Sequence, residues 1–163
     1  MQLTYAAHPP VQDVIDALGR TEDVRFSPSA RRLAVAANSE IAVFRVDIAV
    51  SPGEKRISLT DAVILSSPHL KHPHGIDFFD EETIIVADRG GDACIFALPP
   101  AKANNGHACD AAPLGVIHAG EVELLNTPGS VSVMRKGPQR YGVLICNNFV
   151  HMVTKHRRMF GQR

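Results

Sequence analysis

The chain has 163 residues, with 17 Lys and Arg against 17 Asp and Glu, so its formal net charge is zero. This length allows one domain with a substantial core, and the 45% hydrophobic and 21% charged content argues against disorder. The balanced charge gives no electrostatic reason to expect DNA, RNA or an anionic membrane as a partner, and no apolar run approaches the roughly 18 residues of a membrane span.

Three similar segments follow one another along the chain, each with three predicted strands separated by turn residues. The equivalent residues Val24, Ile76 and Val131 lie 52 and 55 residues apart. Spacing of this size is typical of a four-stranded propeller blade rather than of a solenoid repeat. The predicted strands are residues 22–28, 32–38 and 40–46, then 74–80, 83–89 and 92–98, then 129–134, 142–148 and 150–154.

The first strand of each segment alternates apolar with polar or small residues, which indicates one buried face. We therefore expect Val24 and Phe26 to face the core, as Ile76 and Phe78 do in the second segment. The second strands are continuous apolar runs, as in residues 83–87, and this is typical of strands buried on both faces.

The remaining segments are less strongly patterned. Outer strands are predicted at residues 56–65 and 114–119, and residues 99–113 predict an exposed loop between the third and fourth strands of the second segment. Residues 9–18 fit either a short helix or an incoming strand.

The predicted fold is all-β, a single partial β-propeller with blades of four antiparallel strands at about residues 19–67, 71–120 and 127–156, the last of them incomplete. A generic β-sandwich is the alternative. Closed propellers use about four to eight blades, so three blades would be half of a six-bladed ring. The ring would be closed by a longer protein or by a second copy, and the chain ending just after a third strand favours the longer protein.

The cysteines Cys94, Cys109 and Cys146 are odd in number and scattered, which does not suit a disulfide framework. Residues 1–10 lack the basic and apolar regions of a signal peptide. The sequence therefore predicts a cytoplasmic location. Because Cys94 and Cys146 lie in apolar strands, we expect both to be buried and unreactive.

At Glu22-Asp23-Val24 and Pro73-His74-Gly75-Ile76 the chain resembles six-bladed propellers of the paraoxonase/arylesterase type and their gluconolactonase/regucalcin-like, strictosidine-synthase-like and NHL-repeat relatives. The resemblance implies a calcium-dependent lactone or ester hydrolase. Glu22 would then bind the catalytic calcium, Asp23 a structural calcium, and His74 would activate water. The chain departs from the family at Gly129-Ser130, where the family has Asn-Asp, and at Arg89, which aligns with a second histidine.

The residues themselves support a polar site at the same place. The starting positions of consecutive inner strands converge near one axis, so Glu22 and His74 can share a pocket in which a divalent ion binds or a water is activated. The alternative is that Glu22 and Asp23 are turn residues and that His74 caps a strand. Calcium prefers about six to eight oxygen ligands, and few are at hand, so we expect weak binding.

Asp88 and Asn147 end the second strands of the second and third segments, and Arg89 and Asn148 follow them. We expect these four side chains either to line a ligand groove or to satisfy local backbone donors as turn residues do. Two functions stay open: a propeller related to metal-dependent lactonases and esterases with a site at the channel mouth, or a non-catalytic scaffold that binds a protein or a small molecule. A homodimer is expected only if the chain is complete.

Overall fold

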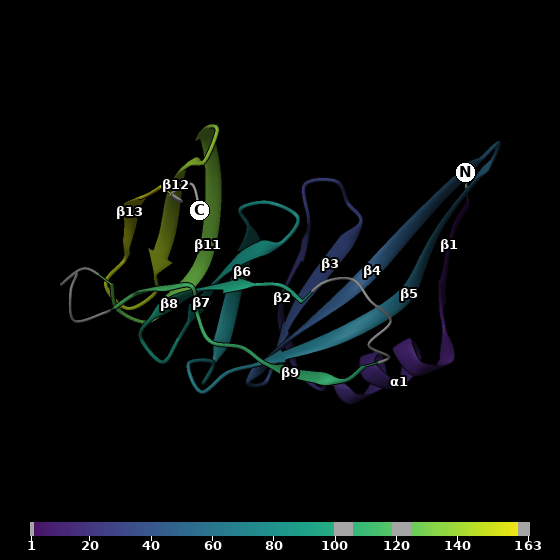
Figure 1. Ribbon diagram of the computed structural model, residues 1–163, viewed down its shortest axis with the longest axis horizontal. Coiled ribbons are helices and arrows are strands. Elements are labelled where there is room, and N and C mark those ends of the chain that lie inside the picture. The colour runs from purple at the N-terminus through teal and green to yellow at the C-terminus, as the bar shows by residue number, and fades with distance from the viewer. Residues whose placement is uncertain (1, 100–105, 119–124, 160–163) are drawn as a thin grey trace.

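The computed structural model describes residues 2–99, 106–118 and 125–159, which form three sheets and one short helix (Figure 1). The first sheet has the strand order β1-β5-β4-β3-β2, the second β10-β8-β7-β6 and the third β11-β12-β13. The strands of the first sheet are β1 (Gln2–Ala7), β2 (Thr21–Phe26), β3 (Arg32–Ala37), β4 (Glu40–Ser51) and β5 (Glu54–Ser66). Those of the second are β6 (Pro73–Phe78), β7 (Thr83–Asp88), β8 (Ala93–Ala97) and β10 (Gly115–Ile117), and those of the third are β11 (Pro128–Gly137), β12 (Arg140–Asn147) and β13 (Met152–Met159).

Successive strands pair antiparallel within each sheet, from β2 to β5, from β6 to β10 by way of β8, and from β11 to β13. Short turns between alternating apolar strands produce this pattern. The all-β class is confirmed, and the predicted three-strand segments coincide with β2–β4, β6–β8 and β11–β13. The predicted outer strands correspond to β5 and β10.

The three sheets lie side by side in chain order, and the strands that adjoin one another are β2, β6 and β11 (Figure 1). The middle sheet is covered on both faces because side chains of β7 alternate between two cores. Ile84 and Val86 pack with residues of the first sheet, whereas Ile85 and Ala87 pack with residues of the third. Burial of apolar surface on both faces is the main force that holds the sheets together.

Residues 9–18 were expected to form either a short helix or an incoming strand, and they form helix α1 (Pro9–Ala17). Pro9 and Pro10 occupy its first turn, where a missing N–H costs nothing. Val11 and Val14 are buried and pack against the outer face of the first sheet. Strand β1 then lies parallel to β5 at the edge of that sheet.

Two expectations about burial are wrong. Val24 is 57% exposed and Phe26 is 45% exposed, because α1 covers another part of the outer face and no described element packs over this end of β2. Cys146 is exposed rather than buried, since it alternates with the inward-facing Ile145 along β12. Cys94 is buried as expected.

The connection from β8 to β10 also differs from the expected exposed loop. Residues 100–105 lie outside the described residues, but Ala108–Asp110 forms strand β9, which pairs in parallel with β5. Within β9, Cys109 packs against the core between the first and second sheets. The chain therefore returns from the second sheet to the first before it forms β10.

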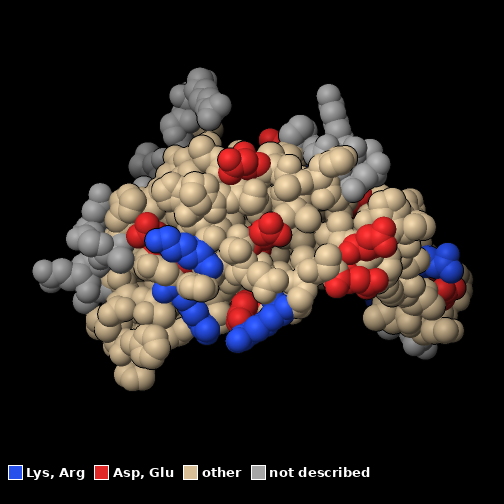
Figure 2. Space-filling view, turned by 90° about the horizontal axis from the view of Figure 1, so that it is seen from below, with Lys and Arg blue, Asp and Glu red and all other residues tan. Residues whose placement is uncertain are grey.

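Charged side chains are unevenly placed on the lower face. Figure 2 shows carboxylates at the end of the molecule that carries α1, on the right, and a group of Lys and Arg side chains left of centre. Among the helices of the described residues, none is long and apolar enough to span a membrane.

Candidate functional site

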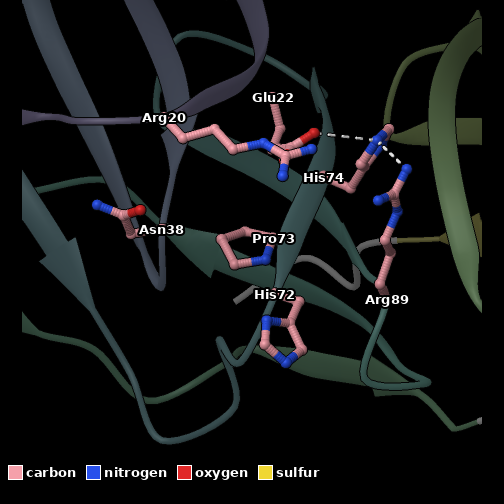
Figure 3. Close-up of a pocket in the computed structure, with 7 residues that line it drawn as sticks. All are labelled: Arg20, Glu22, Asn38, His72, Pro73, His74 and Arg89. Atoms are coloured by element: carbon pink, nitrogen blue, oxygen red, sulfur yellow. Dashed lines mark hydrogen bonds and ion pairs between the residues drawn. The ribbon is translucent and has the colours of Figure 1, made fainter.

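A polar pocket of about 300 Å³ opens where the first and second sheets meet (Figure 3). Glu22 reaches it from β2, His74 from β6 and Arg89 from the turn after β7. Three sequence-predicted residues from two different sheets thus line one pocket. The described residues that line it are Arg20, Glu22, Asn38, His72, Pro73, His74 and Arg89.

The centre of the pocket is a chain of charged and polar contacts around His74. Glu22 Oε2 lies 3.3 Å from His74 Nε2, and Arg89 Nη2 lies 2.6 Å from the same nitrogen. On the other side of the carboxylate, Arg20 Nε forms an ion pair of 2.8 Å with Glu22 Oε1. The side chains of Glu22 and His74 are each 21% exposed, so a molecule in the pocket can reach them.

Two groups compete for one nitrogen of His74. If Nε2 accepts a hydrogen bond from Arg89, the ring proton of a neutral imidazole sits on Nδ1; if Nε2 carries the proton, it donates to Glu22. Nδ1 is buried and has no hydrogen-bond partner among the described residues. A ligand that accepts the Arg89 hydrogens would therefore free Nε2 to act as a base or to bind Glu22.

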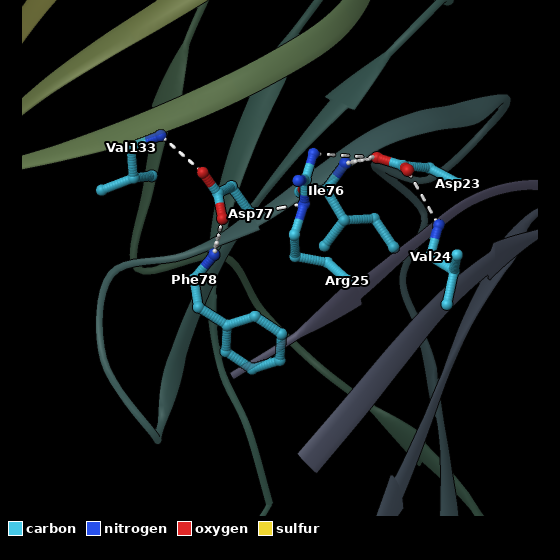
Figure 4. A network of polar contacts seen from close by, with 7 residues as sticks. All are labelled: Asp23, Val24, Arg25, Ile76, Asp77, Phe78 and Val133. Atoms are coloured by element: carbon cyan, nitrogen blue, oxygen red, sulfur yellow. Dashed lines mark hydrogen bonds and ion pairs between the residues drawn. The ribbon is translucent and has the colours of Figure 1, made fainter. Parts of the chain in front are cut away.

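Asp23, predicted as a metal ligand, instead joins β2 to β6 (Figure 4). Its Oδ2 accepts a hydrogen bond of 2.9 Å from the backbone N–H of Ile76, and its Oδ1 accepts one from the N–H of Val24. Asp77 has the same role between the second and third sheets: its Oδ2 accepts a 2.6 Å bond from the N–H of Val133 in β11. Both carboxylates thus link neighbouring inner strands.

Sequence reasoning did not single out Asp77. A signal was present, because an acidic residue in the middle of a buried apolar strand needs a hydrogen-bond partner. The partner lies 56 residues further along the chain, and nothing local in the sequence identifies it.

Asp88 and Asn147 bond to backbone groups of neighbouring loops instead of lining a groove. Asp88 is 1% exposed and accepts hydrogen bonds from the backbone N–H groups of Lys71, His72 and Gly90. It thereby positions the segment that carries His72 into the pocket. Asn147 is 2% exposed and accepts a hydrogen bond from the N–H of Asn126. The turn-residue alternative describes both side chains.

The residues that follow these two also differ from each other. Arg89 lines the pocket, but Asn148 is exposed and its amide lies against Gly129, where an added Cβ would be 2.6 Å from Asn148 Nδ2. Of the four predicted groove residues, Arg89 is thus the one that the pocket lining contains among the described residues.

The donors at the pocket do not match the needs of a calcium ion. Within the described ranges no group of three or more His, Cys, Asp or Glu side chains is placed to hold a metal. Glu22 is paired with Arg20, Asp23 bonds to backbone amides, and the Arg89 guanidinium occupies the space beside His74. Two engaged carboxylates beside guanidinium groups are far from the roughly six to eight oxygens that calcium prefers, so no chemical step is derived through it.

Comparisons with known proteins leave the family open. No family model and no curated protein matches the chain. Among solved structures, it is similar to a functionally unknown protein from Desulfotomaculum acetoxidans DSM 771, with a TM-score of 0.46 and 17% identity over 82% of this chain. The match covers 40% of that protein's length. The resemblance to the paraoxonase group stays a prediction.

Proposed function

We propose that the three sheets are neighbouring blades of a β-propeller and that the pocket lies at the mouth of its central channel. In support, each sheet contains an antiparallel meander, which in the first sheet runs from β2 to β5, and β6, the first strand of its sheet, contacts both β2 and β11. Asp23 and Asp77 link these first strands in turn. Such an arrangement would bring residues from the starts of successive inner strands around one opening.

We infer that this pocket binds a small organic molecule that carries a carboxylate. The observation that carries the inference is that, within the described residues, the Arg89 guanidinium is paired with the imidazole of His74 and with no carboxylate, while Arg20 lies across Glu22. Two guanidinium groups thus face an opening in which Glu22 is the one carboxylate among the described lining residues. A planar carboxylate can accept two hydrogen bonds from one guanidinium, and it would replace the weaker imidazole contact.

The contact between Glu22 and His74 favours a second candidate, hydrolysis of a lactone or ester. In that reaction Nε2 of neutral His74 takes a proton from water while the water oxygen attacks the carbonyl carbon. Glu22 stabilises the imidazolium, and Arg89 stabilises the oxyanion. The C–O bond between the carbonyl carbon and the leaving oxygen then breaks, and the proton passes from Nε2 to that oxygen. A lactone gives a hydroxycarboxylate of the class that the pocket binds, and an ester gives a carboxylate and an alcohol.

Binding is tested by calorimetric titration of the 163-residue chain with short hydroxycarboxylates such as 4-hydroxybutyrate. Arg89→Gln should weaken the affinity at least about tenfold, because it removes a charge-assisted bidentate contact. Arg31→Gln, at an exposed arginine outside this pocket, is the matched control and should leave the affinity unchanged. Equal affinity for wild type and Arg89→Gln would contradict the binding proposal.

Hydrolysis is tested separately with γ-butyrolactone and phenyl acetate. His74→Gln should abolish turnover, whereas His118→Gln, at an exposed histidine paired with Asp92, should not change it. If the wild-type chain shows no turnover, the hydrolase candidate falls and the binding proposal stands on the titration alone.

A further inference from the structure

The outer face of the third sheet carries a cluster of four cations. Along β12, Val143 and Ile145 point into the core, so the residues between them point outward. Leu144 lies opposite Lys155 on this outer face, and Gly142 lies opposite Arg157. We call the set Lys136, Arg140, Lys155 and Arg157 the cationic face.

Direct contacts place Lys136 on the same side. A Cβ added at Gly142 would be 3.0 Å from Lys136 Cε and 3.1 Å from Met134 Cε, so both side chains lie over Gly142. The charge of Lys155, followed by desolvation and the charges of Arg157 and Arg140, lowers the pKa of Lys136. Among the described residues none of these cations forms an ion pair with a carboxylate.

The zero net charge of the chain conceals a strong separation. Residues 124–163 contain none of the 17 acidic residues and seven of the 17 Lys and Arg. Residues 1–123 therefore hold all 17 acidic residues and ten cations, which gives them a formal charge of −7. Residues 124–163 have a formal charge of +7. Unpaired like charges on an exposed face repel one another and favour an acidic partner.

The opposite end of the molecule has the complementary character. A groove of about 470 Å³ lies on the outer face of the first sheet, between α1 and β2. Its lining is mostly apolar, with the carboxylate residues Glu22 and Asp23 and, in the part of the chain that the structure describes, with no Lys or Arg. Helix α1 adds Asp13 and Asp16, both exposed, and has no basic residue. Asp16 is also close to the groove. The pKa of the lining residue Tyr5 is raised, first by desolvation of its own hydroxyl and then by the negative charge of Asp16.

We propose that two copies of this chain associate head to tail, with the cationic face of each copy packed on the acidic, apolar outer face of the other copy's first sheet. Helix α1 covers part of the outer face of the first sheet and leaves the groove beside β2 open, and none of the described elements packs over the cationic face. Met134, Leu144 and Val153 provide apolar surface among the cations, and Val24 and Leu33 provide it in the groove. In a dimer with twofold symmetry, the cationic face of each copy and the outer face of its first sheet are both occupied by the other copy. No binding surface is left free, so the assembly stops at the dimer.

The choice of a second copy over a nucleic acid follows from the apolar portion of these surfaces. A polyanion would satisfy the four cations but would leave Val153, 61% exposed, and Val24, 57% exposed, in water. A second copy covers both kinds of surface and balances +7 with −7. Burial of apolar area then adds to the electrostatic attraction.

The first test is sedimentation velocity of the 163-residue chain over a range of concentrations and salt. A dimer is expected, with a dissociation constant that rises with salt. Lys155→Glu with Arg157→Glu should weaken it at least about tenfold, and so should Asp13→Lys with Asp16→Lys. Arg31→Glu, a charge reversal at an exposed site elsewhere, should leave it unchanged.

The second test mixes the two double variants. Neither should pair with itself, but a mixture should form a one-to-one heterodimer, because each contact then joins opposite charges. Circular dichroism and thermal melts establish that both variants are folded. The proposal is overturned by a monomeric wild type, by a dimer that survives both reversals, by open assemblies of growing size, or by a monomer that binds a DNA oligonucleotide or polyphosphate through these lysines and arginines.

Discussion

A buried carboxylate must find its hydrogen-bond donors inside the protein, and Asp88 finds them in the backbone. It accepts hydrogen bonds from three N–H groups, two before β6 and one in the turn after β7. Removal of the side chain leaves these donors without a partner in a place that water reaches poorly. Asp88 therefore acts on the pocket through the loop that it holds.

We expect Asp88→Ala to lower the free energy of unfolding by about 2–3 kcal/mol, because several buried donors lose their acceptor. Urea denaturation followed by circular dichroism measures the change. Asp47→Ala, at an exposed aspartate, should shift stability by less than about 0.5 kcal/mol. Equal effects of the two substitutions would show that the Asp88 hydrogen bonds contribute little.

The cysteines give a second prediction at this scale. Desolvation, with smaller contributions from the charges of Asp92 and Asp88, raises the pKa of the Cys94 thiol to about 12. Because the thiolate is the reactive form, Cys94 should resist iodoacetamide at about pH 8 in the native protein while exposed Cys146 reacts. Mass spectrometry of the labelled peptides reads out both sites. Labelling of Cys94 at the rate of Cys146 would contradict its burial.

At the scale of the element, β6 and β11 approach so closely that β6 needs a glycine. A Cβ on Gly75 would collide with the carbonyl oxygen of Gly129 and would lie 2.8 Å from Cα of Ser130. These are backbone atoms, which cannot rotate away as a side chain can. The close approach keeps the inner strands within reach of the Asp77 carboxylate.

Gly75→Ala should therefore lower the free energy of unfolding by about 1–3 kcal/mol through overpacking. Gly115→Ala is the matched control, since its Cβ would meet Ile95 Cδ1 at 3.9 Å, an ordinary contact. That control should change stability by less than about 1 kcal/mol. Chemical denaturation of both variants under the same conditions distinguishes the two sites.

The turns of the first two sheets are joined by Glu81, which accepts hydrogen bonds from the backbone N–H and the hydroxyl of Ser29 at 2.7 and 2.8 Å. Desolvation raises the pKa of Glu81, but hydrogen bonds from Ser29 and Ser27 and the charge of Arg32 outweigh it, so the pKa is lowered. A lowered pKa in the folded state gives stability that is present above the unfolded pKa and is lost as pH falls through the folded pKa.

Glu81→Gln should therefore be less stable than the wild type at about pH 7, and the difference should shrink as pH falls below about 4.3, the ordinary glutamate pKa. Thermal melts across this pH range measure it. Glu82→Gln, at the exposed neighbour, is the matched control and should change stability by less than about 0.5 kcal/mol at about pH 7. If the stability difference between the wild type and Glu81→Gln were the same at neutral and at low pH, the charge of the Glu81 carboxylate would not be its cause.

At the scale of the whole molecule, the second sheet shares one core with each neighbouring sheet, whereas the outer face of the first sheet is covered only in part, by α1, and the outer face of the third carries the exposed cations. Local opening needs least free energy where few apolar contacts are lost. In hydrogen exchange, the amides of β7 should be the most protected, and those of β1 and β13 should exchange fastest among the strands. Equal protection across the three sheets would indicate that they unfold as one cooperative unit.

Strand positions were predictable because alternation and turn residues are local properties, and β2–β4, β6–β8 and β11–β13 follow them. The exposure of Val24 and Phe26 was not, because it depends on what lies across the sheet rather than on the strand itself. The pairing of Glu22 with His74 followed from repeat spacing. The role of Asp23 did not, since its partner is the N–H of Ile76, 53 residues away.

Strand β9 gives the first two sheets a second attachment far from their inner strands. It pairs with β5 through Ile64, Leu65 and Ser66, while Asp23 and Arg25 fasten β2 to β6 at the opposite edge. Two sheets that are joined along both edges cannot rotate apart about a hinge. The walls of the His74 pocket are therefore rigid, and a ligand must fit the preformed pocket because the pocket does not close around it.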